Sequence, residues 1–442
     1  MSLKTLLMPM ITERRFARTT LLAKREAAEK ARLAAGRSHE VHYFHQVDDP
    51  YSALMVQVLP RLLQRFDIEL RVHVVSPPPD SAAPERDKLI QYSRIDAELL
   101  ARHTGLKFSD CKRQPSPDRC AQVAHALVAS VLAGRFLELA PALSDWLWAS
   151  DPHALFPEQC NDLPAIARES VGQHRQQADA LREKLGHYLG GMLYYEGEWY
   201  WAVDRLYHLE RRLLELGVGK PGVDGELFPP TPDLSSPRAV GAQKTIDFYF
   251  SFRSPYSAIV APRVFELARL TGAKVNLKFV MPMVMRGLPV PVAKRNYIVQ
   301  DTAREAHARG QQFGRLNDPV GRPTERLLAV MPLAIAQGKG EAFVRSAMQG
   351  VWAEGVNAGS KRGLEKLAER AGLTWADVHK ALGEEAWRTT AQANREELFS
   401  LGLWGVPCYR VGDTMVWGQD RLWAIEQALC GALGPTQVSN AV

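Results

Sequence analysis

The stretch "FYFSFRSPYSAIVAPRVFELARL", Phe248 to Leu270, decides the fold of the C-terminal half. It starts with apolar and aromatic residues, as a buried strand does, and from Pro255 onward its apolar residues recur with helical spacing. Ser254 stands at the junction, where serine is a favoured helix cap and proline a favoured first helical residue. The stretch therefore predicts a strand that turns directly into a helix, with the hydroxyls of Ser254 and Ser257 at the helix start.

An altered copy of this stretch occurs in the N-terminal half. The segment "YFHQVDDPYSALMVQVLPRLL", Tyr43 to Leu63, has Asp49 at the position that Ser254 occupies in the C-terminal half. A second pair of similar segments follows at nearly the same distance in each half, "WAVDRLYHLE" from Trp201 and "WGQDRLWAIE" from Trp417. Two matched pairs at matched spacing predict an internal duplication.

Each copy contains the same predicted order of elements. Short β-branched and aromatic runs predict strands, and Ala/Leu/Glu/Arg-rich segments between them predict helices. The predicted strands are Val41–Phe44 and Glu69–Val75 in the first half, and Ile246–Phe250, Lys274–Val280, Pro407–Val411 and Met415–Trp417 in the second. Gly412-Asp413 predicts the turn between the last two strands, and Asp420 the cap of the final helix. This order predicts an α/β fold of two tandem thioredoxin-like domains, each with a helical insertion.

Composition places the domain boundaries. A chain of 442 residues exceeds the usual size of one hydrophobic core, so two domains are expected. Residues 217–244 lose hydrophobic periodicity and fill with Pro, Gly and Ser, which predicts a linker. We therefore expect an N-terminal extension at 1–37, a first domain at 38–216 and a second domain at 245–435.

The net charge of +6 originates in the extension. Residues 1–37 hold nine Lys/Arg and three acidic residues, 9 − 3 = +6, and the remaining 46 basic and 46 acidic residues balance. We therefore expect no nucleic-acid partner for the folded domains. The extension is predicted to be a basic helix, and two roles stay open, packing in solution or contact with a membrane surface or a partner.

Apolar runs and cysteine spacing give expectations about membrane insertion, cellular location and metal binding. No apolar run is long enough to span a bilayer, so no transmembrane segment is expected. Five cysteines without a C-x-x-C pair favour a reducing, cytoplasmic location, and Cys111 and Cys120 show no recognised zinc spacing, so no metal is expected. The sequence leaves a homodimer open.

The C-terminal half, about Thr245 to Leu433, resembles the DsbA-like thioredoxin superfamily. The similar branch contains 2-hydroxychromene-2-carboxylate isomerase and the kappa-class glutathione transferases. Five separated motifs carry the resemblance: Ser254-Pro255-Tyr256-Ser257, "AKRNYIVQDTARE" (Ala293 to Glu305), "WAEGVN" (Trp352 to Asn357), "GVPCY" (Gly405 to Tyr409) and "WGQDRL" (Trp417 to Leu422).

This resemblance implies a use for Ser254. Redox relatives carry the two cysteines of C-x-x-C where this chain has Ser254 and Ser257. A helix N-terminus stabilises a thiolate, whereas a serine without an activating base is a poor nucleophile. The resemblance implies that Ser254 stabilises the thiolate of glutathione as a cofactor, with Pro255, Tyr256 and Ser257 in the same binding segment. The alternative is that Ser254 only caps the helix.

Two further motifs imply the rest of the glutathione site. The Val406-Pro407 bond is expected to be cis, which would turn the Val406 backbone toward an extended glutathione cysteinyl unit. Gln419 and Asp420 are implied to bind the γ-glutamyl end, and Asp420 has the alternative role of a helix cap. Cys408 is expected to be buried and inert.

The substrate side is implied by Lys294 and Tyr297, which lie three residues apart and share one helix face. In similar proteins this face covers the active site, so Lys294 is expected to attract a substrate carboxylate and Tyr297 to donate a hydrogen bond. The isomerases carry an asparagine in the preceding loop, but Pro282 to Val292 contains none. Arg286 is the candidate replacement.

The N-terminal copy is expected to be non-catalytic. Asp49 would repel a thiolate at the position of Ser254, and the position of Pro407 falls at about Gly191. The aromatic residues of this half are expected to pack in its core and between domains, namely Tyr194, Tyr195, Trp199, Tyr200 and Trp201.

These features predict a glutathione-dependent isomerase or transferase. Its substrate would be a small electrophilic molecule, an aromatic or unsaturated acid, attacked by the thiolate that Ser254 stabilises. The alternative is a binding or scaffold protein in which both thioredoxin-like domains lack redox chemistry and hold a peptide along the Val406 edge.

Overall fold

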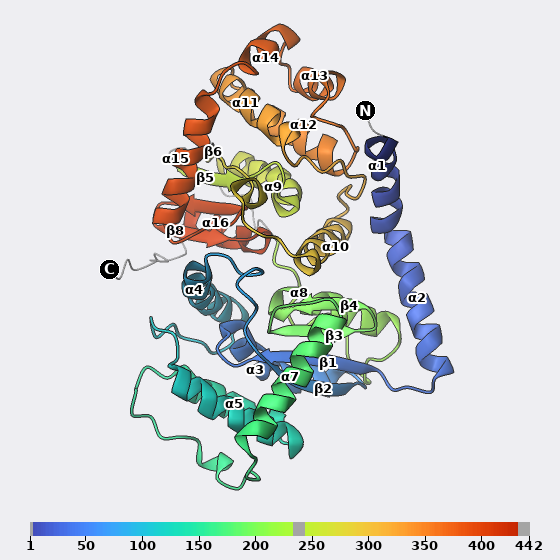
Figure 1. The fold of residues 1–442 in the computed structure, drawn as a ribbon, viewed down its shortest axis with the longest axis vertical. Coiled ribbons are helices and arrows are strands. Elements are labelled where there is room, and N and C mark those ends of the chain that lie inside the picture. The colour runs from blue at the N-terminus through green and yellow to red at the C-terminus, as the bar shows by residue number, and fades with distance from the viewer. Residues whose placement is uncertain (1–2, 233–243, 432–442) are drawn as a thin grey trace. The chain divides into compact units, whose positions relative to one another are not determined.

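A computed structural model describes residues 3–232 and 244–431, with the side chains of α1 from Leu7 onward. The chain divides into two compact units. The N-terminal unit is Lys24–Pro230, and the C-terminal unit joins Met1–Ala23 to Thr231–Val442. Figure 1 shows the helices and strands of both units as a ribbon.

The N-terminal unit contains a four-stranded sheet in the order β2-β1-β3-β4. β1 pairs parallel with β2 and antiparallel with β3, which pairs antiparallel with β4. Its elements are the end of α2 (Arg18–Ala34), β1 (Glu40–Gln46), α3 (Pro50–Arg65), β2 (Glu69–Val75), α4 (Arg86–Thr104), α5 (Pro117–Leu132), α6 (Phe136–Leu147), η1 (Glu158–Cys160), α7 (Arg168–Lys184), β3 (Met192–Tyr195), β4 (Glu198–Trp201) and α8 (Ala202–Glu215).

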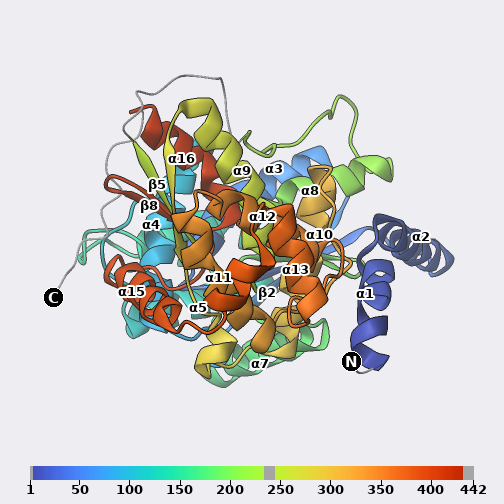
Figure 2. The ribbon, with the colours of Figure 1, turned by 90° about the horizontal axis from the view of Figure 1, so that it is seen from above.

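The C-terminal unit contains a sheet with the same strand order and directions, β6-β5-β7-β8. Helices α11 to α14, drawn in orange, follow one another between β6 and β7, and α9 and α16 lie side by side (Figure 2). Its elements are α1 (Leu3–Phe16), the start of α2, β5 (Thr245–Phe250), α9 (Pro255–Thr271), β6 (Lys274–Phe279), η2 (Met283–Arg286), α10 (Val292–Ala308), α11 (Arg322–Ala336), α12 (Gly340–Trp352), α13 (Lys361–Arg370), α14 (Trp375–Ala381), α15 (Ala386–Ser400), β7 (Cys408–Val411), β8 (Thr414–Trp417), η3 (Gln419–Arg421) and α16 (Leu422–Leu429).

The predicted strands are confirmed to within two residues at either end. One predicted cap is wrong. Asp420 lies inside the 3-10 turn η3, and α16 begins only after Arg421. The reason is Gly418, which lies two residues before Asp420 and caps the 3-10 turn with a φ of 107°.

Both sheets have the same backbone hydrogen bond just beyond their last pair of strands. The amide of Gly418 donates to the carbonyl of Pro407 at 2.9 Å, and the amide of Ala202 donates to the carbonyl of Gly191 at 2.9 Å. This hydrogen bond places Gly191 at the position of Pro407. The shared strand order and this shared contact support the predicted duplication, which stays a prediction.

The cores consist of the apolar residues that the strand and helix patterns placed inside. In the C-terminal unit, Phe248 stacks on Tyr409 with 5.7 Å between ring centroids. In the N-terminal unit, Tyr195 and Tyr200 are fully buried and Trp199 is nearly so, which confirms their predicted core packing.

The predicted linker at 217–244 differs from the structure over its first part. Val218 is buried, Gly219 pairs with Phe66, and the amide of Lys220 donates to the Arg65 carbonyl at 2.8 Å. These contacts place the first part of the predicted linker in the N-terminal unit, because Val218 contributes apolar surface to its core. Residues 233–243 lie outside the described residues.

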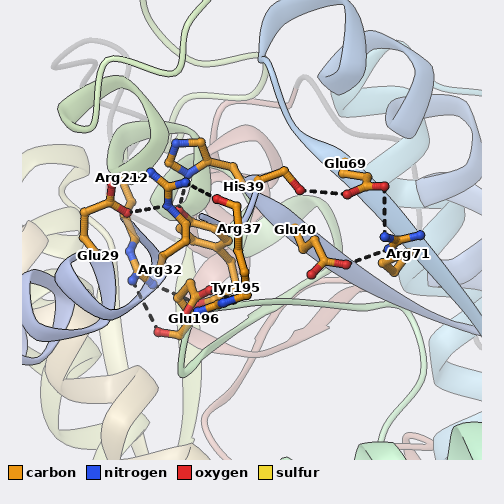
Figure 3. A network of polar contacts seen from close by, with 11 residues as sticks. Glu29, Arg32, Arg37, His39, Glu40, Glu69, Arg71, Tyr195, Glu196 and Arg212 are labelled. Atoms are coloured by element: carbon orange, nitrogen blue, oxygen red, sulfur yellow. Dashed lines mark hydrogen bonds and ion pairs between the residues drawn. The ribbon is translucent and has the colours of Figure 1, made fainter. Parts of the chain in front are cut away.

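The predicted basic helix at 1–37 is two helices, α1 and α2. Polar contacts hold the end of α2 and the chain after it within the N-terminal unit (Figure 3). Arg32 pairs with Glu29 at 2.6 Å, and Arg37 pairs with Glu196 at 2.6 Å. His39 shares a 2.7 Å hydrogen bond with the Tyr195 hydroxyl. Across the described residues, no helix is long and apolar enough to cross a membrane.

Candidate active site of the C-terminal unit

Ser254 lies where β5 ends and α9 begins. Its backbone is extended (φ −91°, ψ 113°), so its side chain can turn back to accept from the Ser257 amide at 3.1 Å. The same hydroxyl donates to the Val406 carbonyl at 3.2 Å. The start of α9 and the loop before β7 therefore meet at one oxygen atom, although Ser254 and Val406 are 152 residues apart.

The loop that reaches Ser254 carries a cis Val406-Pro407 bond, which confirms the prediction. Pro407 is buried and Val406 is half-buried. On the other side of the loop, a Cβ on Gly405 would overlap the ring of Trp417. Only glycine therefore allows β8 to approach so closely, and the loop is held between α9 and β8.

The remaining residues of the Ser-Pro-Tyr-Ser motif point in different directions. Ser257 is fully buried, and its hydroxyl has no hydrogen-bond partner among the described residues. Pro255 is buried at the first helical position. The Tyr256 hydroxyl donates to Asp301 of α10 at 2.7 Å. Ser254 is thus the motif hydroxyl that lies at the Val406 loop.

Lys294 of α10 lies near the same loop. Its ammonium nitrogen is 5.7 Å from the ring centroid of Trp404, two residues before Val406. Burial lowers the pKa of Lys294 to about 8. Trp404 is buried against Trp417, and its indole nitrogen has no hydrogen-bond partner in the described parts of the chain. Tyr297 is half-buried one turn further along α10.

Gln419 is buried, and its amide is engaged by protein groups. Arg263 donates to its oxygen at 2.6 Å, and its nitrogen donates to Glu305 at 2.9 Å and also to Asp420. These contacts favour a role in positioning Asp420 over the predicted direct contact with a ligand. Asp420 itself is half-buried.

Comparison with known proteins assigns a domain family to the C-terminal unit. Residues 245–430 match the family described as DSBA-like thioredoxin domain. The C-terminal unit carries a DsbA-like thioredoxin domain. This finding confirms the predicted superfamily for that half, whereas the matched range leaves out the N-terminal unit.

Similar proteins align with the DsbA-like domain over nearly their whole length. The chain is 28% identical over 202 residues to 2-hydroxychromene-2-carboxylate isomerase of Sphingobium xenophagum, covering 42% of this chain and 98% of that protein. It is 26% identical over 196 residues to the Pseudomonas putida protein of the same name, covering 42% and 93%. A solved structure of 2-hydroxychromene-2-carboxylate isomerase has 24% identity and a TM-score of 0.38, and covers 42% and 95%.

Within the DsbA-like domain, one contact that sequence reasoning missed joins α9 to α10. Asp301 is buried, accepts from Tyr256, and pairs with Arg304 at 2.8 Å. The N-terminal unit contains the same link, in which the Tyr51 hydroxyl donates to Asp96 at 2.7 Å. The separation is 45 residues in both, so aligning the two halves would have revealed it.

The "WAEGVN" motif supports the same part of the DsbA-like domain. The indole of Trp352 donates to the Phe252 carbonyl at 2.9 Å, two residues before Ser254. Next to Ser254, Arg253 forms two hydrogen bonds of 2.8 and 2.9 Å to Asp318. The segment between β6 and β7 therefore fixes the approach of the chain to Ser254.

Arg286 and Arg395 both lie over the ring of Phe399. Their guanidinium carbons are 5.7 and 5.4 Å from the ring centroid. The predicted replacement residue, Arg286, therefore packs against α15.

Cys408 of the DsbA-like domain is buried, and its thiol donates to the Gly405 carbonyl at 3.0 Å. Burial raises its pKa well above the ordinary value, so the thiolate is disfavoured. The structure confirms the predicted burial of Cys408.

In the N-terminal unit, the position that corresponds to the Ser254 hydroxyl is occupied by the carboxylate of Asp49. Asp49 caps α3, where it accepts from the Ser52 amide at 2.9 Å and the Ser52 hydroxyl at 2.8 Å. Gly191 has a φ of 63°, and a Cβ there would lie 2.9 Å from an Asp49 oxygen. Burial raises the pKa of Asp49 to about 6. The carboxylate fills the place where the other unit has its Ser254 hydroxyl.

Proposed function

We propose that the DsbA-like domain is an isomerase of the 2-hydroxychromene-2-carboxylate isomerase type that uses glutathione. The substrate would be a small electrophilic aromatic or unsaturated acid. The similar proteins carry this name and are covered over 93% and 98% of their length. The observation that carries the proposal is the Ser254 hydroxyl, which lies between the start of α9 and the Val406 carbonyl.

The residues present fit glutathione. The N-terminus of α9 favours an anion through its amides and dipole. Ser254 gives its proton to a neutral carbonyl, and a thiolate would be the stronger acceptor because it is charged. Ser257 Oγ in the first turn of α9 and Trp404 Nε1 in the loop before β7 are buried donors without partners in the described chain. When bound, glutathione supplies a thiolate nucleophile.

Four residues of the domain would bind glutathione and the substrate. Ser254 would donate a hydrogen bond to the anionic sulfur, the half-buried Val406 would offer its backbone, and Asp420 would accept from the γ-glutamyl ammonium group. Lys294 would attract the substrate carboxylate. Its pKa of about 8 keeps it mostly protonated at neutral pH, by roughly ten to one.

Titration calorimetry with glutathione tests the proposal. The full chain should bind glutathione, and Ser254→Ala should weaken binding near neutral pH. Ser116→Ala is the matched control because Ser116 also caps a helix, α5 of the N-terminal unit. Absence of glutathione binding by the unaltered chain, or equal loss in both variants, would contradict the proposal.

One observation favours the alternative of a binding or scaffold protein. The Ser254 hydroxyl already accepts from Ser257 and donates to Val406, so it has a complete structural role without any ligand. In that case Ser254→Ala would lower the free energy of unfolding, and glutathione would not change the unfolding temperature of the unaltered chain.

A further inference from the structure

Helix α1 has one face packed against the C-terminal unit. Pro9, Thr12 and Phe16 lie on this face, with the spacing of successive helical turns. The Thr12 hydroxyl accepts from the Leu316 amide at 2.9 Å. Pro9 is buried against Gly355, and a Cβ on Gly314 would lie 3.2 Å from the Cβ of Phe16. This face is therefore occupied.

The opposite face of α1 is apolar and exposed. Leu7, Met10, Ile11 and Arg14 follow the same helical spacing on that side, and Met8 lies at its edge. Met10 and Ile11 are 51% and 56% exposed. Four of the eleven exposed large apolar side chains in the described chain lie on this one helix: Leu7, Met8, Met10 and Ile11. Scattered exposed apolar residues are ordinary, but a cluster on one helix face indicates an interaction surface.

Positive charge adjoins this apolar face. Arg14, Arg15 and Arg18 are exposed at the end of α1 and the start of α2. The neighbouring acid, Glu13, lies 3.7 Å from Arg315. Among the residues that the structure describes, neither Arg14 nor Arg18 has a carboxylate partner. The surface therefore combines four apolar side chains with a group of cations that are not neutralised locally.

We propose that this face of α1 binds the surface of an anionic lipid bilayer. Leu7, Met8, Met10 and Ile11 enter the interface, and Arg14, Arg15 and Arg18 contact acidic headgroups. With 14 residues, α1 is too short to span a bilayer and lies along its surface. Because the other face stays packed against Leu316 and Gly355, the C-terminal unit is held at the bilayer with it.

Charge decides against a second copy of the chain as the occupant. A twofold dimer through this face would bring each arginine group toward its own copy, since such an interface pairs the same patch with itself. Like charges that face each other disfavour association. An anionic bilayer offers the opposite charge together with an apolar interior.

Vesicle co-sedimentation of the full chain tests the proposal. Binding to phosphatidylcholine vesicles that contain phosphatidylglycerol should exceed binding to phosphatidylcholine alone, and salt should weaken it. Arg14→Gln with Arg18→Gln should lower the partition coefficient about 25-fold, at about fivefold for each arginine. Met10→Glu with Ile11→Glu should lower it at least as far, because both side chains would leave the apolar layer.

Two matched controls separate this surface from general effects. Leu155→Glu changes an apolar side chain that is 86% exposed in the N-terminal unit, and Arg362→Glu reverses an exposed charge on α13. Both should bind vesicles as the unaltered chain does. All α1 variants should keep the helical circular dichroism and the glutathione affinity of the unaltered chain, because the exposed face of α1 supports neither.

Three results would overturn the proposal. The first is equal binding to vesicles with and without phosphatidylglycerol, which includes no binding to either. The second is an equal loss in Leu155→Glu or Arg362→Glu. The third is a dimer in sedimentation velocity that only Met10→Glu with Ile11→Glu dissociates, because this result would assign the face to a second copy.

Discussion

The hydroxyl of Ser254 serves two protein groups at once, and a ligand thiolate would have to displace one of them. It holds the first turn of α9 through Ser257 and the neighbouring loop through Val406. The Val406 bond is the one that a charged acceptor would replace, because it uses the hydroxyl proton.

Ser254→Ala should therefore raise the pKa of bound glutathione. One charge-assisted hydrogen bond contributes about 1.5 to 3 kcal/mol, which corresponds to a rise of about one to two pH units and a similar loss in decades of turnover. Thiolate absorbance against pH measures the effect. Ser257→Ala should have a smaller effect, since Ser257 is fully buried in the first turn of α9. An unchanged thiolate titration in Ser254→Ala would remove the mechanism.

Lys294 should limit activity at alkaline pH. Burial lowers its pKa to about 8, so its positive charge is present below that pH and is lost as the pH rises through it. KM for an acidic substrate should then rise about tenfold per pH unit above the pKa. Lys294→Arg should move this rise to higher pH, because arginine stays charged. Steady-state kinetics against pH decides this, and a KM that stays flat to pH 10 in the unaltered chain would exclude the role.

At the scale of the elements, the hydrogen bond between Tyr256 and Asp301 connects the two helices that carry the site. Ser254 caps α9 and Lys294 lies on α10, so this bond links the helices on which both side chains depend. The same bond exists between α3 and α4 of the N-terminal unit, as Tyr51 to Asp96.

This repetition supplies a matched pair of variants. Tyr256→Phe and Tyr51→Phe each remove one hydrogen bond to a buried carboxylate, and each should lower the free energy of unfolding of its own unit by about 1.5 to 3 kcal/mol. Only Tyr256→Phe should also raise KM for the acidic substrate, because only α10 carries Lys294. Urea unfolding combined with kinetics separates the effects. Equal kinetics in the two variants would show that the bond is structural alone.

At the scale of the whole molecule, the chain consists of two units with the same sheet order, of which the second carries the DsbA-like domain. The position of Ser254 is an aspartate cap in the first unit, and the position of Pro407 is Gly191. The first unit keeps the architecture and lacks both groups on which the proposed chemistry depends.

Limited trypsin digestion should cut between the units at Arg238. Residues 231–243 keep the Pro- and Ser-rich composition of a linker. Arg211, by contrast, lies in α8 of the N-terminal unit and pairs with Glu226 at 2.5 Å, so it should resist cleavage. Mass spectrometry of the first fragments identifies the site. Early cleavage at Arg211 with Arg238 intact would contradict the placement of the unit boundary after residue 230.

Local features of this chain follow from neighbouring residues alone. The strand before Ser254, the cap at Ser254 and the turn at Gly412-Asp413 depend on residues a few positions apart, whose conformational preferences act over one or two turns. The strand boundaries therefore agreed with the structure. The predicted cap at Asp420 failed because the positive φ of Gly418 and the buried contacts of Gln419 place a 3-10 turn there.

Contacts between side chains that are distant in the sequence are seen only in the tertiary structure. Ser254 and Val406 are separated by 152 residues, and Tyr256 and Asp301 by 45, so no local pattern specifies either contact. The same holds for α1, whose composition left packing and surface binding open. Its packed face is set by contacts such as the hydrogen bond from the Leu316 amide to Thr12, since burial depends on residues that lie far away along the chain.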